Sequence, residues 1–221
     1  YAETVVPKDV IARLYEGQVL SSVPAKYHPN MFLHLTAAEN PDLKAIARVF
    51  PDWTLSEINL AIDTVYGIQS RNVEQRMALE LLMDPEVSIV TLVGQAGTGK
   101  TLLALAAGLH LVQREHLYDR ILVSRPIVPL GKDIGYLPGD KEEKLSHWME
   151  PIFDNLDYLL RKCQPDLPPA GAKKQPKLLS PQERINQLLD TDTLELEALT
   201  YIRGRSISKQ FLIIDEAQNL T

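Results

Sequence analysis

The sequence predicts an α/β fold, with a parallel-sheet core that follows a small β-rich unit. Three observations support this prediction. Residues 87–93 are mostly apolar and β-branched, which is typical of a buried parallel strand. A glycine-rich loop comes next, and residues 101–113 are rich in helix formers. A further apolar run, residues 210–214, ends in two acids. We expect two domains, residues 1–66 and residues 67–221.

The glycine-rich loop fits the phosphate-binding pattern G-x-x-x-x-G-K-[ST]. Its glycines let backbone N–H groups turn inward around a triphosphate, and the N-terminus of the next helix adds partial positive charge. Lys100 is expected to bridge the β and γ phosphates, and the hydroxyl of Thr101 to bind Mg²⁺. The strand–loop–helix setting favours a P-loop NTPase core over an ordinary glycine turn. The expected nucleotide-binding residues of the loop are Gly94, Gln95, Ala96, Gly97, Thr98, Gly99, Lys100 and Thr101.

The composition excludes several classes of protein. Of the 221 residues 45% are hydrophobic, which is sufficient for a globular core. The net charge of −6 provides no general attraction for nucleic acid or an anionic membrane, so such binding would be local. A single cysteine, Cys163, excludes a disulfide framework and a cysteine-based zinc site, and it suits a reducing compartment. The sequence shows neither an apolar run of membrane-spanning length nor a signal pattern, which favours the cytoplasm.

The first 66 residues carry no nucleotide-binding pattern. Short β-favouring pieces alternate with Pro, Asn and Gly, which predicts a small β-barrel or a β-rich adaptor. Residues 54–65 fit both a helix and a strand, and both interpretations stay open. His28 and His34 are expected to be surface or edge residues, because no cluster of metal ligands accompanies them. The predicted strands are residues 3–6, 19–23, 31–36 and 45–50, with one helical turn at residues 10–15.

A helix is predicted over residues 72–83, ended by Asp84-Pro85. Asn72 and Gln75 have the spacing of an N-cap and the third helical residue. One interpretation is that Gln75 closes a capping box. The other is that its amide, with a donor and an acceptor, binds the edge of an adenine ahead of the phosphate-binding loop.

The middle of the chain alternates structured pieces with Pro/Gly-rich loops. A strand over residues 118–124 should end at Arg125-Pro126, since proline breaks the ladder. The long loop that follows, to residue 139, lies where open α/β sheets bind ligands. The remaining predictions are a helix over residues 141–162 broken or kinked at Pro151 with Trp148, Ile152, Phe153 and Leu156 as core, a charged linker over residues 164–177, and a helix over residues 181–189.

The last predicted strand, residues 210–214, leads into Asp215 and Glu216. An apolar strand followed by two acids has the form of a magnesium-binding strand end. Asp215 is expected to hold the metal, directly or through water, and Glu216 to orient and deprotonate an attacking water. A second acid that positions water favours hydrolysis over transfer to another acceptor.

These blocks together resemble the PhoH family of P-loop ATPases, over about residue 66 onward. They include residues 71–75 (RNVEQ), 94–101 (GQAGTGKT), 124–126 (SRP), 131–139 (GKDIGYLPG), 143–144 (EK), Trp148, 199–205 (LTYIRGR) and 215–218 (DEAQ). The first block is most similar to the branch in which a PIN ribonuclease domain precedes the ATPase. In that branch residues 1–66 would be the connector after the nuclease.

The resemblance implies a RecA-like core, similar to superfamily 1 helicases, that hydrolyses ATP with Mg²⁺ and unwinds or moves along single-stranded RNA. It favours Gln75, with Asn72 beside it, as part of the adenine site. Arg125, Lys132, Arg203 and Arg205 are candidate contacts to phosphates, RNA or an adjacent subunit.

The chain also departs from the family pattern. It begins at Tyr1 and stops soon after the acids, so we expect a piece of a longer protein. The family's sensor strand and completing arginine would lie beyond Thr221, so hydrolysis by this piece is expected to be weak. The resemblance also implies a homo-oligomeric ring in the full-length protein.

Two other functions stay open. A P-loop kinase would need an acceptor site with its own base, and Glu216 as a water activator argues against it. A nucleotide-gated RNA-binding module without motor activity would use the β-rich unit to hold RNA or a partner.

Overall fold

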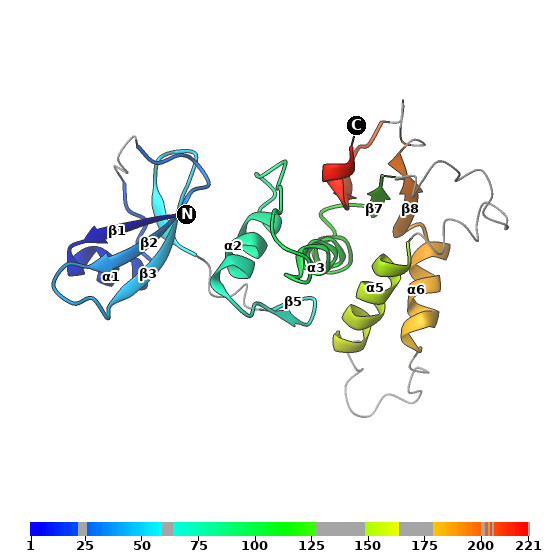
Figure 1. Ribbon diagram of the computed structural model, residues 1–221, viewed down its shortest axis with the longest axis horizontal. Helices are drawn as coiled ribbons and strands as arrows, with labels where there is room; N and C mark the ends of the chain where they lie inside the picture. The colour runs from blue at the N-terminus through cyan, green and yellow to red at the C-terminus, as the bar shows by residue number, and fades with distance from the viewer. Residues whose placement is uncertain are drawn as a thin grey trace. The chain divides into compact units, whose positions relative to one another are not determined.

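The structure is a computed structural model that describes residues 1–21, 26–58, 64–126, 149–163, 179–199, 202, 204 and 206–220 (Figure 1). The described residues form two compact units. One comprises Tyr1–Asp63 and Arg71–Val90, and the other comprises Thr64–Ser70 and Thr91–Thr221. This division groups residues 71–90 with the N-terminal unit, and the predicted domain boundary at residue 66 stays a prediction. No described helix is long and apolar enough to cross a membrane.

The first unit is built on a four-stranded sheet in the order β1-β2-β3-β4. Strand β1 runs parallel to β2, and the other neighbours are antiparallel. Leu33, Leu35 and Val49 alternate into a core that Ile11 and Leu14 of helix α1 complete. The elements are β1 (Ala2–Val6), α1 (Lys8–Tyr15), β2 (Phe32–Ala37), β3 (Lys44–Val49), β4 (Leu55–Glu57) and helix α2 (Val73–Leu82).

The N-terminal predictions are confirmed in kind and changed in detail. The pieces expected at residues 3–6, 31–36 and 45–50 are strands β1, β2 and β3, and the expected helical turn is the eight-residue helix α1. The described strands form an open sheet and not a closed barrel. Leu55–Glu57 is a strand, so the strand interpretation holds for that part of residues 54–65. His34 stacks on the ring of Tyr1, with ring centroids 4.3 Å apart, and the described residues gather no metal-binding cluster.

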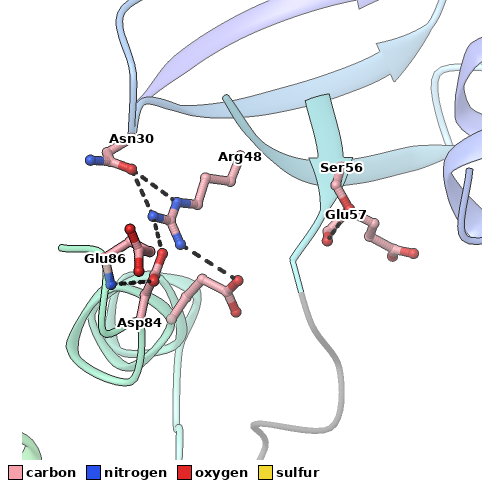
Figure 2. A network of polar contacts seen from close by, with 7 residues as sticks. Asn30, Arg48, Ser56, Glu57, Asp84 and Glu86 are labelled. Carbon is pink, nitrogen blue, oxygen red and sulfur yellow. Dashed lines mark hydrogen bonds and ion pairs between the residues drawn. The ribbon is translucent and has the colours of Figure 1, made fainter. Parts of the chain in front are cut away.

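Arg48 joins the sheet of the first unit to the end of helix α2 (Figure 2). Its side chain is only 2% exposed. Nη2 donates to Oδ1 of Asn30 at 2.7 Å and to Oδ2 of Asp84 at 2.6 Å, and Nη1 lies 4.0 Å from Oε1 of Glu80. Oδ1 of Asp84 accepts from the backbone N–H of Glu86 at 3.0 Å. The buried guanidinium is therefore paired and hydrogen-bonded, as burial of a charge requires.

The second unit contains a parallel three-stranded sheet in the order β8-β7-β9. Helix α3 packs on β7 and β9, and it also contacts helix α5, which packs on α6. The core comes from Leu105, Leu109, Ile121, Val123 and Leu156. The elements are β5 (Thr64–Val65), β6 (Ile68–Gln69), α3 (Lys100–Gln113), β7 (Arg120–Arg125), α5 (Glu150–Lys162), α6 (Pro181–Asp190), β8 (Leu194–Ala198), β9 (Gln210–Ile214) and the short 3₁₀ helix η3 (Ala217–Asn219).

Several predicted elements of the second unit are present within two residues of their expected bounds. Helix α3 starts one residue earlier than expected, β9 matches, and α6 begins at Pro181 with a capping box between Ser180 and Glu183. Helix α5 begins at Glu150, so Pro151 lies in its first turn, where a missing N–H costs little. The expected helical residues 141–148, including Trp148, lie outside the described residues, as do residues 127–139 of the long loop and the linker at residues 164–177.

The prediction of a buried parallel strand at residues 87–93 is wrong for this structure, in which those residues form no strand. Ile89 is 85% exposed and Val93 is 90% exposed. A strand needs a neighbour for its backbone hydrogen bonds. In the described sheet β7 pairs with β8 and β9, and residues 87–93 pair with the outer edge of neither β8 nor β9. An apolar, β-branched composition shows that a segment can be buried, but it does not show that a neighbouring strand is available to pair with it.

Candidate nucleotide-binding site

The phosphate-binding loop has the backbone shape that its glycines allow. Gly97 and Gly99 have φ of 77° and 86°, in the left-handed region that a β-carbon disfavours. Gly99 is the N-cap of α3, and its carbonyl accepts the N–H of Leu103 at 2.9 Å. The helix thus begins directly at Lys100, and its first N–H groups lie beside the loop. This arrangement provides backbone donors and partial positive charge for an anion.

The ammonium group of Lys100 turns back over the loop. Its Nζ donates to the carbonyl oxygens of Gly94 at 2.9 Å and Gln95 at 2.8 Å. The hydroxyl of Thr98 donates to the carbonyl of Gln95 at 2.8 Å. These bonds hold the cation above the loop, where phosphate oxygens can replace the carbonyl acceptors.

Thr101 and Asp215 lie side by side although 114 residues separate them. Oγ1 of Thr101 donates to Oδ1 of Asp215 at 2.8 Å. The backbone N–H of Asp215 donates to the carbonyl of Ser124 at 2.9 Å, which continues the pairing of β9 with β7 one residue past the strand. The sheet and helix α3 therefore bring the two expected magnesium ligands together. A hydroxyl and a carboxylate oxygen at a helix N-terminus suit Mg²⁺, which takes few protein ligands and completes its shell with water and phosphate oxygens.

Glu216 leaves the end of β9 through a left-handed backbone, with φ of 53°. Its side chain is 43% exposed, and one of its carboxylate oxygens accepts a hydrogen bond from Nε2 of Gln218. The carboxylate that is expected to activate water thus lies at the strand end, next to Asp215, and is accessible to solvent.

Arg125, at the end of β7, lies against both acids. Its Nε is 3.7 Å from Oδ2 of Asp215, and its Nη2 is 3.9 Å from Oε1 of Glu216. The sequence interpretation treated Arg125 as a contact to phosphates or RNA, and that role stays a prediction. The geometry adds a second role, which is to balance the negative charge of the two carboxylates.

Asn72 and Gln75 belong to the first unit and form a helix cap. Oδ1 of Asn72 accepts the N–H of Gln75 at 2.8 Å, as an N-cap does. Oε1 of Gln75 accepts the N–H of Arg71 at 2.8 Å, one residue earlier than a capping box requires. Asn72 therefore caps the helix, Gln75 bonds to the N–H of Arg71 in place of closing a capping box, and the adenine contact stays a prediction. Lys132, Arg203 and Arg205 lie outside the described residues.

Ser124 belongs to the block at residues 124–126, but sequence reasoning assigned it no role of its own. It is fully buried, and its Oγ has no hydrogen-bond partner among the described residues, although its carbonyl holds the N–H of Asp215. The sequence signal that could have identified it is a hydroxyl that directly follows the apolar residues 121–123 of β7. The structure thus brings the backbone of Ser124 against Asp215 and leaves its buried hydroxyl without a partner in the described part of the chain.

A family model described as PhoH-like protein matches residues 67–221, which include the loop, Thr101 and Asp215. The chain belongs to the PhoH family. The family generally consists of ATP-binding P-loop proteins and is associated with ATPase activity. The mixed α/β structure with its parallel strands agrees with a domain of this kind.

Individual relatives extend the similarity to the first unit. The chain is 44% identical over 225 residues to "Protein PhoH2" of Bacillus subtilis, which covers 100% of this chain and 47% of that protein. It is 36% identical over 221 residues to "Protein PhoH2" of Thermobispora bispora, which covers 99% of this chain and 45% of that protein. The chain thus spans about half the length of these curated relatives.

Proposed function

We propose that this chain binds ATP with Mg²⁺ at residues 94–101 and hydrolyses it. The hydrogen bond between Thr101 and Asp215 carries the proposal, because it joins the phosphate-binding loop to the acidic strand end. Either motif alone is a weaker signal, since glycine loops and acidic strand ends also occur without nucleotide. Their contact at 2.8 Å supports a shared site for a triphosphate and its metal.

In the proposed reaction each side chain has a separate task. Mg²⁺, when bound, neutralises charge on the β- and γ-phosphate oxygens, and Thr101 and Asp215 hold it. Lys100 exchanges its carbonyl acceptors for phosphate oxygens. Glu216 accepts a proton from water as the water oxygen bonds to the γ-phosphorus. The bond from that phosphorus to the β–γ bridging oxygen breaks, and its electrons remain on ADP.

We also propose that ATP hydrolysis drives movement on single-stranded RNA, within a longer, ring-forming protein that carries a PIN ribonuclease. This part depends on the resemblance to that PhoH branch and on the length of the relatives, about twice that of this chain. The single thiol, Cys163, suits the reducing cytoplasm, which we propose as the location.

Phosphate release from ATP with Mg²⁺, with and without single-stranded RNA, tests the proposal. It is measured for this chain and for a chain extended past Thr221. We expect RNA-stimulated release in the extended chain, and its loss in Lys100→Ala and in Glu216→Gln. Glu216→Gln should keep ATP binding, because that carboxylate acts on water, whereas Lys100→Ala should weaken it. Lys44→Ala, an exposed lysine of the first unit, is the matched control.

The alternatives give different results. A phosphorylated small molecule without free phosphate would indicate a kinase. Tight ATP binding with no release in either chain would exclude the motor and leave a nucleotide-gated binding module.

A further inference from the structure

A second pocket lies in the second unit, at the opposite end of α3 from Lys100. Its volume is about 670 Å³, within the usual range for small-molecule sites. Its walls come from the end of α3, the approach to β7, the end of α5 and the start of α6. Helix α3 has 14 residues, so at about 1.5 Å per residue the pocket is roughly 20 Å from the phosphate-binding loop. It is therefore separate from the site described above.

The floor of this pocket is polar and well ordered by hydrogen bonds. The ring of Tyr66 is buried, and its hydroxyl donates to Oε1 of Gln113 at 2.6 Å. The thiol of Cys163, also buried, lies 3.9 Å from Nη2 of Arg114. Burial raises the pKa of the Tyr66 hydroxyl, and Cys163 adds to this, whereas Arg184 and Arg114 lower that pKa. Both guanidinium groups are thus close enough to the phenol to affect it.

Arginine side chains give the pocket its charge. Nη1 of Arg184 donates to the carbonyls of Leu160 at 2.6 Å and Cys163 at 3.0 Å, which fixes the guanidinium at the end of α5. Arginine has five N–H donors, so the two bonds of Nη1 and the interaction with the Tyr66 hydroxyl still leave donors of Arg184 for an anion. Among the described residues of the lining, Asp119 carries a carboxylate, against the two arginines Arg114 and Arg184. In a chain of net charge −6, this is a locally positive pocket that favours an anion.

Aromatic and hydrogen-bonding groups surround these cations. The ring of Tyr118 packs edge-on against Phe211, with centroids 5.6 Å apart, and Tyr118 itself is partly exposed in the pocket wall. His116 and Thr193 add further polar groups to the lining. Guanidinium groups suit a phosphate, a tyrosine ring suits a base, and a carboxylate accepts from a ribose hydroxyl or an exocyclic amine.

From this combination we propose that the pocket is a second nucleotide site, which binds the phosphate of a nucleoside monophosphate. The nucleotide is either free or the 5′-phosphorylated end of an RNA strand, since both present the same chemistry. Arg114 and Arg184 bind the phosphate, and Tyr118 packs against the base. The proposal does not depend on ATP hydrolysis at the phosphate-binding loop.

Binding is tested by titration calorimetry without Mg²⁺, on protein that carries Lys100→Ala to weaken binding at the loop. The probes are AMP and 5′-phosphorylated ApApA, beside adenosine and unphosphorylated ApApA. We expect the phosphorylated probes to bind and the unphosphorylated ones to bind at least about tenfold more weakly. Equal affinity for AMP and the phosphorylated trinucleotide would identify a free nucleotide as the ligand, and clearly tighter binding of the trinucleotide would identify an RNA end.

Arg114→Gln is the decisive variant, because Arg114 is exposed and its loss should leave the fold intact. We expect it to lower the affinity for the phosphorylated probes roughly tenfold. Arg161→Gln removes another exposed cation, on α5, that is not among the lining residues, and it should leave affinity unchanged. Equal weakening by both variants, no effect of Arg114→Gln, or no binding of phosphorylated probes at millimolar concentration would overturn the proposal.

Discussion

Thr101 and Asp215 are coupled by a bond that connects two distant parts of the sequence. The hydroxyl donates to a carboxylate oxygen, and in the proposed site both oxygens hold the same cation. Thr101→Val keeps the side-chain shape and removes that oxygen. We expect the variant to lose about tenfold in Mg²⁺-dependent ATP affinity, because one contact to a charged group contributes about 1.5–3 kcal/mol.

This effect is measured by titrating ATP with and without Mg²⁺. Thr191→Val is the control, since the hydroxyl of Thr191 bonds only within its own turn and to Thr193. An unchanged response to Mg²⁺ in Thr101→Val would argue against the assignment of the metal ligands.

Arg48 provides a test of stability in the first unit. Arg48→Met retains much of the side-chain volume but removes the cation that lies against the buried Glu80 and the half-buried Asp84. We expect the free energy of unfolding, measured in urea, to fall by about 3–5 kcal/mol, as when one partner of a buried ion pair is removed. Arg13→Met changes an exposed arginine and should cost little. A loss below about 1 kcal/mol for Arg48→Met would contradict this reading.

Gly108 of helix α3 lies against Phe211 of β9. A β-carbon at this position would lie 2.9 Å from Cδ1 of Phe211, which is closer than real β-carbons approach other atoms. Gly108→Ala should therefore destabilise the second unit by about 1–3 kcal/mol, although alanine is the better helix former. In a Phe211→Leu background the same substitution should be neutral or stabilising. Chemical denaturation of the four proteins in this cycle measures the coupling, and additive effects would contradict it.

The capping box of helix α6 should weaken in acid through its Glu183 half. The pKa of Glu183 is lowered, first by the hydrogen bond from the backbone N–H of Ser180 and then by the Ser180 side chain. A lowered folded-state pKa gives stability that is present above the unfolded value and is lost as pH falls through the folded one. We therefore expect the helix to weaken below about pH 4.5, the usual value for a glutamate. Glu183→Gln should remove this pH dependence in amide exchange of residues 181–190, and persistence of the dependence would contradict it.

The helices and the acidic strand were predictable because their signals are local. Asn72, Pro181 and Gly99 mark helix starts through caps and backbone freedom that involve only neighbouring residues. Strand β8 was not predicted, although Leu194, Leu196 and Ala198 alternate with glutamates. Over only five residues a period of two is too short to distinguish a strand from a helix. The wrong strand at residues 87–93 has the opposite cause, since its local signal was strong and its pairing is not local.

The candidate site was predictable to the same extent. The loop pattern and the two acids identified Lys100, Thr101, Asp215 and Glu216, and the structure places Thr101 against Asp215. The ion pairs of Arg125 and the buried Ser124 depend on the register between β7 and β9, in which Ser124 faces Ile214. No single segment of sequence contains that register, so these contacts appear only in the fold.

For the molecule as a whole, the residues proposed to bind the phosphates and Mg²⁺ lie within one of its two units. Lys100, Thr101 and Asp215 all belong to the second unit, and the four-stranded sheet of the first holds none of them. We expect saturating ATP with Mg²⁺ to slow amide exchange in α3, β7 and β9. At an ATP concentration one hundred times its dissociation constant, the free energy of opening should rise by about 2.7 kcal/mol. Strands β1–β3 should exchange at unchanged rates. Equal protection of both units, or protection that survives in Lys100→Ala, would contradict a site confined to the loop and the acidic strand end.

The left-handed backbone of Glu216 bears on how this protein would evolve. A residue with a β-carbon incurs about 1–2 kcal/mol of strain in that region, and glycine incurs none. Selection for heat resistance alone would therefore favour replacing Glu216 by glycine, and selection for turnover would retain the acid. A laboratory population passed through a folding screen without an activity screen should accumulate the glycine, so the position would record which of the two pressures a lineage has experienced.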